Sequence, residues 1–210
     1  IIMEIAENNE LIVIEDACHG INANYKSKPL GTFGLTGGFS MHPLKNLNVW
    51  GDGGYIITGS KFLTGDNKDV WLIKTDSQGD SVWTKTFGDD GYDWGRSVEQ
   101  TTDGGYIITG CKNCATDASD VWLIKTDSQG NEEWNQTFGG SEDDKGYSAK
   151  QTLDGGYIIT GQTNSFGNGD ADVWLIKTDS GGNEEWNQTY GGTSFDDGYS
   201  VQQTTDGGYI

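Results

Sequence analysis

Two cysteines at C-x-x-C spacing, Cys111 and Cys114, are the first residues whose types and spacing could do chemistry. Thiolates at this spacing occur in metal sites, but a zinc site needs further ligands, and one such pair is a weak indication. Corresponding positions in two other sequence repeats read Ser60–Leu63 and Gln162–Ser165. We therefore expect incidental thiols, and we expect Cys18 to be a packing residue. Three cysteines cannot form a disulfide framework.

Acidic residues recur in a way that could bind a cation. Adjacent pairs lie at Asp89-Asp90, Asp143-Asp144 and Asp196-Asp197. Hard cations such as Ca²⁺ prefer clustered oxygens, so a calcium-binding rim is one interpretation. No spacing here matches a known calcium loop, so a solvated acidic rim is favoured and no metal site is expected. Single aspartates also precede each Val-Trp pair, where hydrogen bonding at the start of a strand is the favoured role. These are Asp69, Asp120 and Asp172.

Aromatic and amide side chains offer two further readings. The repeated tryptophans could stack sugars on a lectin-like face, but core packing between layers is favoured. Asn135 and Asn187 begin N-x-T sequons, which matter only in a secreted chain.

These residues belong to a repeat that occupies most of the chain. The string DGGYIITG begins at Asp52, Asp103 and Asp154, and its first five residues return at Asp206. The string DVWLIKTDS occupies 69–77, 120–128 and 172–180. Each period predicts four short strands rich in β-branched and aromatic residues. In the second copy these are Gly105–Gly110, Val121–Thr126, Glu133–Phe138 and Tyr147–Thr152.

Local patterns in the repeat specify more than strand positions. Val121–Ile124 is apolar on both faces, which is typical of a strand between two layers. Asp127–Gly130 predicts a tight turn in which glycine takes a positive φ.

Four strands in each period are typical of a β-propeller blade, and a β-solenoid with shorter coils is the alternative. The Gly-Gly pair, the Val-Trp strand and the second Trp resemble kelch-like propeller repeats. In kelch repeats the Gly-Gly pair follows a strand, so the resemblance implies architecture only. We predict a mainly β fold with about three four-stranded blades in an open, incomplete array. The blades span 52–102, 103–153 and 154–205, and a truncated blade starts at 206–210. Such a scaffold, extracellular or on the cell surface, would bind a protein or glycan.

The first 51 residues differ from the rest in composition. Every proline, histidine and methionine of the chain lies in this segment. The segment as a whole carries only a small share of the net charge of −19. So acidic a chain is not expected to bind nucleic acid through the phosphate backbone. No apolar run reaches membrane-spanning length, and residues 1–15 show no signal-peptide pattern.

The first segment carries motifs in a specific order. VIEDACHG (13–20), GTFG (31–34) and FSMHPLKNLNVWGDGG (39–54) resemble the DegT-type sugar-nucleotide aminotransferases, which are pyridoxal 5'-phosphate enzymes of fold type I. The resemblance implies that Lys45 forms the Schiff base and shuttles a proton. It implies that Asp16 pairs with the pyridinium, that His19 lies near the ring and that Ser40 helps hold the phosphate. The implied reaction transfers an amino group to a keto-sugar nucleotide in a cytoplasmic homodimer.

The resemblance covers residues 1–58, a short α/β piece of a catalytic domain. We expect a partial cofactor segment over 1–51 and no catalysis from this chain alone. Residues 51–58, GDGGYIIT, fit both patterns, which predicts a chimera produced by recombination or by misjoined sequence assembly, with a true fusion as the alternative. The first residue is not Met and the last lies inside the repeat motif, so a fragment of a longer protein is expected.

Overall fold

The computed structural model describes strand residues 14–16, 24–25, 28–29 and 36–38, and then residues 53–63, 67–116 and 118–210. The chain divides into two compact units, Ile1–Gly54 and Tyr55–Ile210. In the described residues the secondary structure consists of strands and turns, without helices. The mainly β prediction is therefore confirmed, whereas most of the predicted α/β piece lies outside the described residues.

The first unit contains two small pairs of strands. Strand β1 (Ile14–Asp16) pairs in parallel with β4 (Thr36–Gly38), and Asp16 lies opposite Gly38. Strand β2 (Asn24–Tyr25) forms an antiparallel hairpin with β3 (Lys28–Pro29). A parallel pair is typical of α/β folds, in which a crossover joins the strands.

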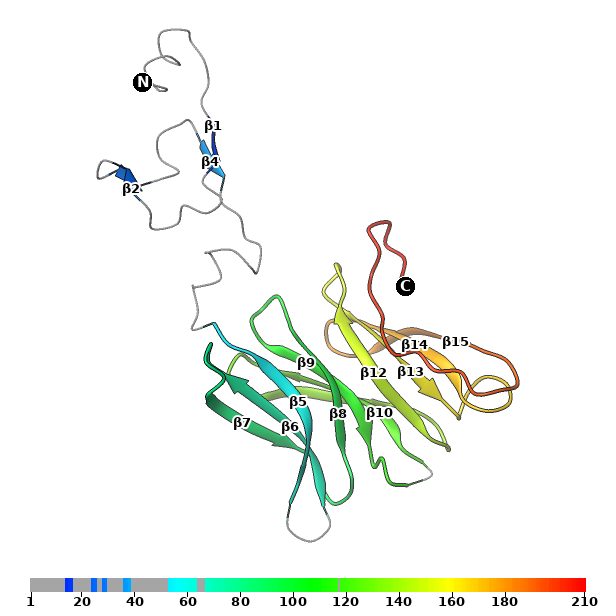
Figure 1. The fold of residues 1–210 in the computed structure, drawn as a ribbon. Coiled ribbons are helices and arrows are strands. Elements are labelled where there is room, and N and C mark those ends of the chain that lie inside the picture. The colour runs from blue at the N-terminus through cyan, green and yellow to red at the C-terminus, as the bar shows by residue number, and fades with distance from the viewer. Residues whose placement is uncertain are drawn as a thin grey trace. The chain divides into compact units, whose positions relative to one another are not determined.

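The second unit contains eleven strands in three antiparallel sheets (Figure 1). The first sheet contains β5 (Ile56–Phe62), β6 (Lys68–Thr75) and β7 (Ser81–Phe87). The second contains β8 (Trp94–Gln100), β9 (Tyr106–Lys112), β10 (Asp120–Thr126) and β11 (Glu132–Phe138). The third contains β12 (Asp144–Gln151), β13 (Tyr157–Thr163), β14 (Asp172–Thr178) and β15 (Glu184–Tyr190). The four strands expected in the second period are all present.

The sheets are offset from the sequence periods by one strand. Each of the last two sheets begins with the final strand of the preceding period, so β8 pairs with β9 and β12 pairs with β13. The first sheet consequently has three strands, and the prediction of three four-stranded units is wrong for it. Within the described residues the sheets form an open row.

Glycines allow the first strand of each later sheet to join its neighbour. The register shifts between Gly95 and Ser97, where β8 bulges against β9. A Cβ on Gly110 would lie 1.7 Å from the carbonyl oxygen of Trp94, so only glycine fits there. The hairpin turn after β10 is also confirmed, because Asp127 accepts the Gly130 N–H and Gly130 has a φ of 76°.

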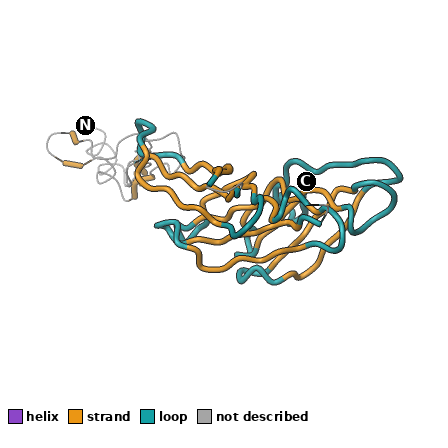
Figure 2. The backbone as a smooth tube through the Cα atoms, turned by 90° about the horizontal axis from the view of Figure 1, so that it is seen from below, coloured by secondary structure: helices purple, strands orange, loops and turns teal. Residues whose placement is uncertain are grey.

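The core lies between the sheets, which stack face to face when the chain is viewed from below (Figure 2). Trp122 and Trp174 are 4% and 2% exposed, which confirms the packing interpretation for these two tryptophans. Trp134 contacts Tyr157 edge-on with ring centroids 5.7 Å apart, so the outer strand of one sheet packs on the next sheet.

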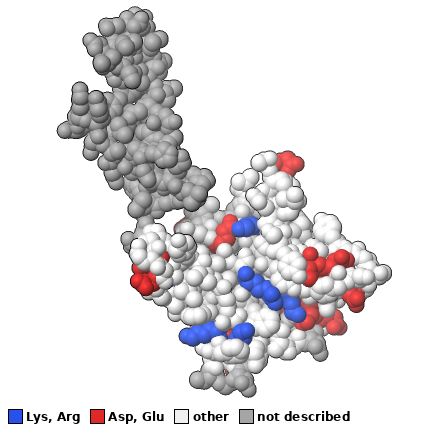
Figure 3. All heavy atoms as spheres, in the orientation of Figure 1, with Lys and Arg blue, Asp and Glu red and all other residues white. Residues whose placement is uncertain are grey.

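The described surface carries its charges in small groups. Figure 3 shows small basic and acidic groups on one face of the second unit, several of them side by side, with uncharged surface over much of the rest. No helix within the described ranges is long and apolar enough to cross a membrane.

Candidate functional site

Of the four predicted cofactor residues, one lies among the described residues. Asp16 is the last residue of β1, at the carboxyl end of a parallel strand pair, and its backbone alone is described. His19, Ser40 and Lys45 lie outside the described residues. Their assignment to a cofactor site stays a prediction.

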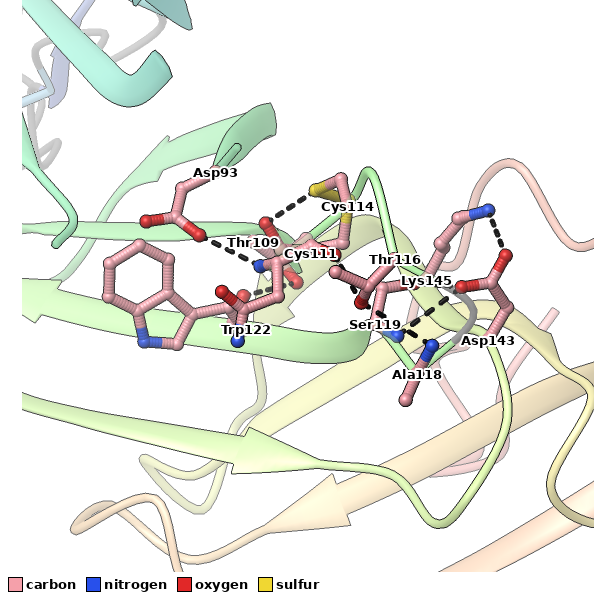
Figure 4. The surroundings of a disulfide bond; sticks show 11 residues. Asp93, Thr109, Cys111, Cys114, Thr116, Ala118, Ser119, Trp122, Asp143 and Lys145 are labelled. Atoms are coloured by element: carbon pink, nitrogen blue, oxygen red, sulfur yellow. Dashed lines mark hydrogen bonds and ion pairs between the residues drawn. A yellow bond between two sulfur atoms is a disulfide. The ribbon is translucent and has the colours of Figure 1, made fainter. Parts of the chain in front are cut away.

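The cysteine prediction is wrong. Cys111 and Cys114 form a disulfide in the loop after β9, with Cα atoms 5.6 Å apart (Figure 4). Cys111 is fully buried and Cys114 is 8% exposed. The Cys114 sulfur lies 2.8 Å from the Cys111 carbonyl oxygen, a contact without a hydrogen bond because a disulfide sulfur carries no proton. The spacing was noted in the sequence, but pairing of the two sulfurs depends on the turn between them.

The aspartates that lie close together are also not the adjacent pairs expected from the sequence. A single aspartate at the start of each of the two later sheets, and a third after β15, donates its N–H to a backbone carbonyl earlier in the chain. Asp93 donates to the carbonyl of Lys68, Asp144 to Ser119, and Asp196 to Ala171. Each of these aspartates faces the aspartate that precedes a Val-Trp pair. The three facing pairs are Asp69/Asp93, Asp120/Asp144 and Asp172/Asp196. Asp144, which belongs to one of the adjacent pairs expected to form a solvated rim, is fully buried, so that expectation is wrong for it. Asp93, which lies outside those adjacent pairs, is also fully buried.

The strand-start role predicted for the first member of each pair is partly borne out. Asp172 Oδ2 accepts the Asn168 N–H at 2.6 Å. Burial raises the pKa of Asp69, and a hydrogen bond from Asn67 opposes that shift. Burial and then the charge of Asp144 raise the pKa of Asp120.

Two buried lysines were missed by the sequence interpretation. The ammonium of Lys125, on a side chain 4% exposed, lies 2.8 Å from both Asp103 and Glu133. Lys177 repeats this arrangement with Asp154 and Glu185 at 3.0 and 2.9 Å. The sequence feature that could have indicated them is a lysine that directly follows the apolar residues Val-Trp-Leu-Ile in every copy of the repeat. These contacts hold the Asp-Gly-Gly turn against the centre of its own sheet.

The lysine networks shift several pKa values. The hydrogen bond from Lys125 is the main reason that the pKa of Asp103 falls to about 2. Thr152 and then Lys177 lower the pKa of Asp154 to about 2. Burial lowers the pKa of Lys125, but its hydrogen bonds to Asp103 and Glu133 outweigh this effect and raise it.

A cavity of about 500 Å³ lies where β12 meets the C-terminal segment. Its lining is mostly amide and hydroxyl, with one ion pair between Lys150 and Glu99 at 2.6 Å. Leu153 at its rim is 88% exposed. The lining residues are Glu99, Lys150, Gln151, Leu153 and Gln202–Thr205. In the described ranges, this cavity included, no group of three or more His, Cys, Asp or Glu side chains is arranged to hold a metal ion.

Comparison with known proteins matches the N-terminal part of the chain to a family. Residues 1–89 match the DegT/DnrJ/EryC1/StrS aminotransferase family, which is pyridoxal-phosphate dependent. The match passes the expected limit at residue 58 and runs through β7, so it overlaps the first sheet of the repeat.

Individual relatives show the same partial coverage. A pleiotropic regulatory protein of Geobacillus stearothermophilus is 47% identical over 62 residues, or 30% of this chain and 17% of that protein. A UDP-N-acetyl-3-dehydro-alpha-D-glucosamine 3-aminotransferase of Acidithiobacillus ferrooxidans is 44% identical over 62 residues, with the same coverage of both chains. GDP-perosamine synthase of Escherichia coli O157:H7 is 39% identical over 62 residues, again 30% and 17% of the two chains. The chain thus spans less than a fifth of the length of these relatives, and residues 1–89 are similar to a segment of DegT-type aminotransferases.

Proposed function

We propose that residues 1–51 are a segment of a pyridoxal-phosphate-dependent aminotransferase that acts on keto-sugar nucleotides. The observation that carries the proposal is the family match over residues 1–89, together with the ordered motifs around Asp16 and Lys45. The parallel β1–β4 pair supports it, because cofactors of α/β proteins bind at the carboxyl ends of such strands. The whole enzyme would be a homodimer, by resemblance to the family.

The cofactor, when bound, supplies an electron sink for amino-group transfer. In this proposal Lys45 presents the amine to the cofactor and moves the substrate proton. Asp16 keeps the pyridine nitrogen protonated, His19 lies near the ring and Ser40 holds the phosphate. A chain spanning less than a fifth of its relatives lacks the walls of that pocket, so we expect no transamination by this chain alone.

Borohydride trapping tests this expectation. The full chain is incubated with pyridoxal 5'-phosphate, reduced with borohydride and mapped by peptide mass spectrometry. We expect no label on Lys45 above the level on exposed lysines such as Lys61. Selective labelling of Lys45, lost in a Lys45→Ala variant, would show that the segment holds the cofactor and would contradict the proposal of an inactive segment.

The repeat supports a second candidate function, a non-enzymatic scaffold of β-propeller type that binds a protein or glycan. Its support is one Trp–Tyr contact that occurs three times, twice between sheets and once between β15 and the C-terminal segment. Trp83 packs on Tyr106, Trp134 on Tyr157 and Trp186 on Tyr209, with ring centroids 5.7 to 5.9 Å apart. A repeated sheet-to-sheet contact is the means by which propeller blades assemble.

The cavity beside Leu153 is the candidate ligand site of this scaffold. We expect oligosaccharides presented on an array to bind the full chain, and Leu153→Asp to weaken that binding. Leu63→Asp, at a partly exposed position on the first sheet, is the control. Absence of binding across the array would leave a protein ligand as the remaining form of the scaffold proposal. Equal loss in both variants would exclude this cavity as the site.

A further inference from the structure

The boundary between the first two sheets holds two carboxylate oxygens that lack hydrogen-bond donors. Asp69 is 6% exposed and Asp93 is fully buried. Among the described residues, neither Asp69 Oδ1 nor Asp93 Oδ2 has a hydrogen-bond partner. Burying an ionised carboxylate that has no hydrogen-bond partner is unfavourable, so a buried pair needs compensation.

The two oxygens face the same small region. A Cβ on Gly88 would lie 2.5 Å from Asp69 Oδ1 and 2.7 Å from Asp93 Oδ2. A glycine at this position therefore leaves room for the carboxylates to converge. The two aspartates come from different sheets, because Asp69 lies in β6 and Asp93 directly precedes β8.

In the equivalent pair between the second and third sheets, Asp120 and Asp144, hydrogen-bond donors compensate the buried carboxylate of Asp144. There Asp144 Oδ2 accepts the Ser165 hydroxyl at 2.6 Å and the Gly140 N–H at 2.9 Å. The position equivalent to Ser165 is Cys114 in the preceding repeat, where the sulfur is bonded to Cys111 and has no proton to donate. The first pair thus lacks the hydroxyl that satisfies the second.

The remaining contacts of the first pair leave a negative site. Asp93 Oδ1 accepts the Asn113 N–H at 2.9 Å, a bond drawn beside the disulfide in Figure 4. Besides burial, which is the main cause, the negative charge of Asp89 raises the pKa of both Asp69 and Asp93, while a backbone hydrogen bond from Asp89 lowers the pKa of Asp93. Lys112 acts on Asp93 but is paired with Asp89 at 3.1 Å. A positive charge between the two carboxylates is the missing element.

We propose that Asp69 and Asp93 bind one Ca²⁺ ion, which ties the first sheet to the second. Ca²⁺ takes carboxylate oxygens and completes its shell with backbone carbonyls and water, so two aspartates suffice as its charged ligands. The third pair is intermediate, because Asp172 Oδ1 has no partner whereas Asp196 Oδ2 accepts the Gly192 N–H. The first pair is therefore the site expected to bind most tightly.

Calcium titration of the full chain tests the proposal. The protein is freed of metal with a chelator and titrated with CaCl₂ at pH 7, by calorimetry and by melting temperature. We expect saturable binding and a melting temperature raised by about 5 °C at a hundredfold excess over Kd. A wild-type chain that neither binds Ca²⁺ nor gains stability overturns the proposal without any variant.

Three variants locate the ion. Asp69→Asn with Asp93→Asn should abolish binding, whereas Asp120→Asn, in the pair that Ser165 satisfies, should retain it. Cys111→Gln with Cys114→Ser copies the Gln162–Ser165 sequence of the next repeat and leaves the ligands intact. It should weaken Ca²⁺ binding about tenfold, since one competing hydrogen bond to a charged group is worth at least that factor.

Other outcomes point elsewhere. Calcium binding that survives in the Asp69→Asn and Asp93→Asn variant would place the ion on the general acidic surface and overturn the proposal. Stabilisation by mild acid with no response to calcium would mean that the two carboxylates share a proton instead.

Discussion

Lys125 and Lys177 combine full burial with full charge, and each is held by one aspartate and one glutamate. Lys74 is the equivalent residue in the first sheet, but the position of Glu133 is Val82 there. The three lysines therefore allow the contribution of the glutamate to be measured, because two of them have it and Lys74 does not.

We predict that Lys125→Met and Lys177→Met each lower the free energy of unfolding by about 1–2 kcal/mol. Met keeps the apolar stem but removes the donor, and the acidic partners, about half exposed, then return to water. Lys74→Met should cost less. Urea unfolding measures all three variants, and equal losses would show that the glutamate contributes nothing.

The acidic groups predict a stability maximum on the acid side of neutrality in chelator-treated protein. Asp69, Asp93 and Asp120 have folded pKa values above the ordinary 3.8, so stability rises as the pH falls through those values. Asp103 and Asp154 have folded pKa values of about 2, so their contribution is present above 3.8 and is lost as the pH falls toward 2.

Urea unfolding at a series of pH values measures both limbs of this profile. Asp69→Asn should flatten the rise, and Lys125→Met should flatten the fall. A profile that declines steadily from pH 7 would contradict the assignment of the rise to the buried aspartates.

At the scale of the elements, the strand that opens each later sheet depends on glycine in its neighbour. A Cβ on Gly110 would lie 1.7 Å from Trp94 O, and one on Gly161 would lie 1.8 Å from Lys145 O. A Cβ on Gly59, the equivalent residue in the first sheet, would meet nothing within 4 Å. This difference follows from the three-stranded first sheet, in which no described strand lies beside β5 on that edge.

We predict that Gly110→Ala and Gly161→Ala each destabilise the chain by about 3 kcal/mol, at the upper end of the range for overpacking. Gly59→Ala should change stability by less than about 0.5 kcal/mol. Thermal and urea unfolding measure the three variants side by side. A large loss in Gly59→Ala would mean that another strand occupies that edge in solution.

At the scale of the whole molecule, the first sheet exposes a face that its counterparts bury. Tyr55 and Ile57 are 63% and 47% exposed, whereas the equivalent Tyr106 and Ile108 are 3% and 1% exposed. In the second sheet this face receives Trp83 from its neighbour.

We predict that this exposed face docks on a second copy of the chain. Sedimentation velocity should show concentration-dependent association that Ile57→Lys reduces at least tenfold, since a buried charge opposes docking. Leu153→Lys, at an exposed position away from this face, is the control. Sedimentation as a monomer at every concentration would count against the contact.

The two halves of the chain differ in how far their function can be argued from residues. The family match covers Asp16, His19, Ser40 and Lys45. A cofactor chemistry can therefore be proposed for these four residues, although the structure describes none of their side chains. The family match extends to residue 89, whereas the repeat continues through strands β8–β15, whose structure is described in detail. Its function therefore has to be argued from its surfaces and its charge pairs.

Sequence by itself determined the repeat, its strands and its turns, because β propensity, apolar runs and turn glycines act between near neighbours along the chain. The turn at Asp127–Gly130 and the strand at Val121–Thr126 needed only local information. Tertiary structure alone decided which strands share a sheet, which aspartates face each other and which lysines are buried. Asp69 and Asp93 are 24 positions apart and meet only because one sheet stacks on the next. Their pairing depends on backbone hydrogen bonds between sheets, which no spacing in the sequence encodes.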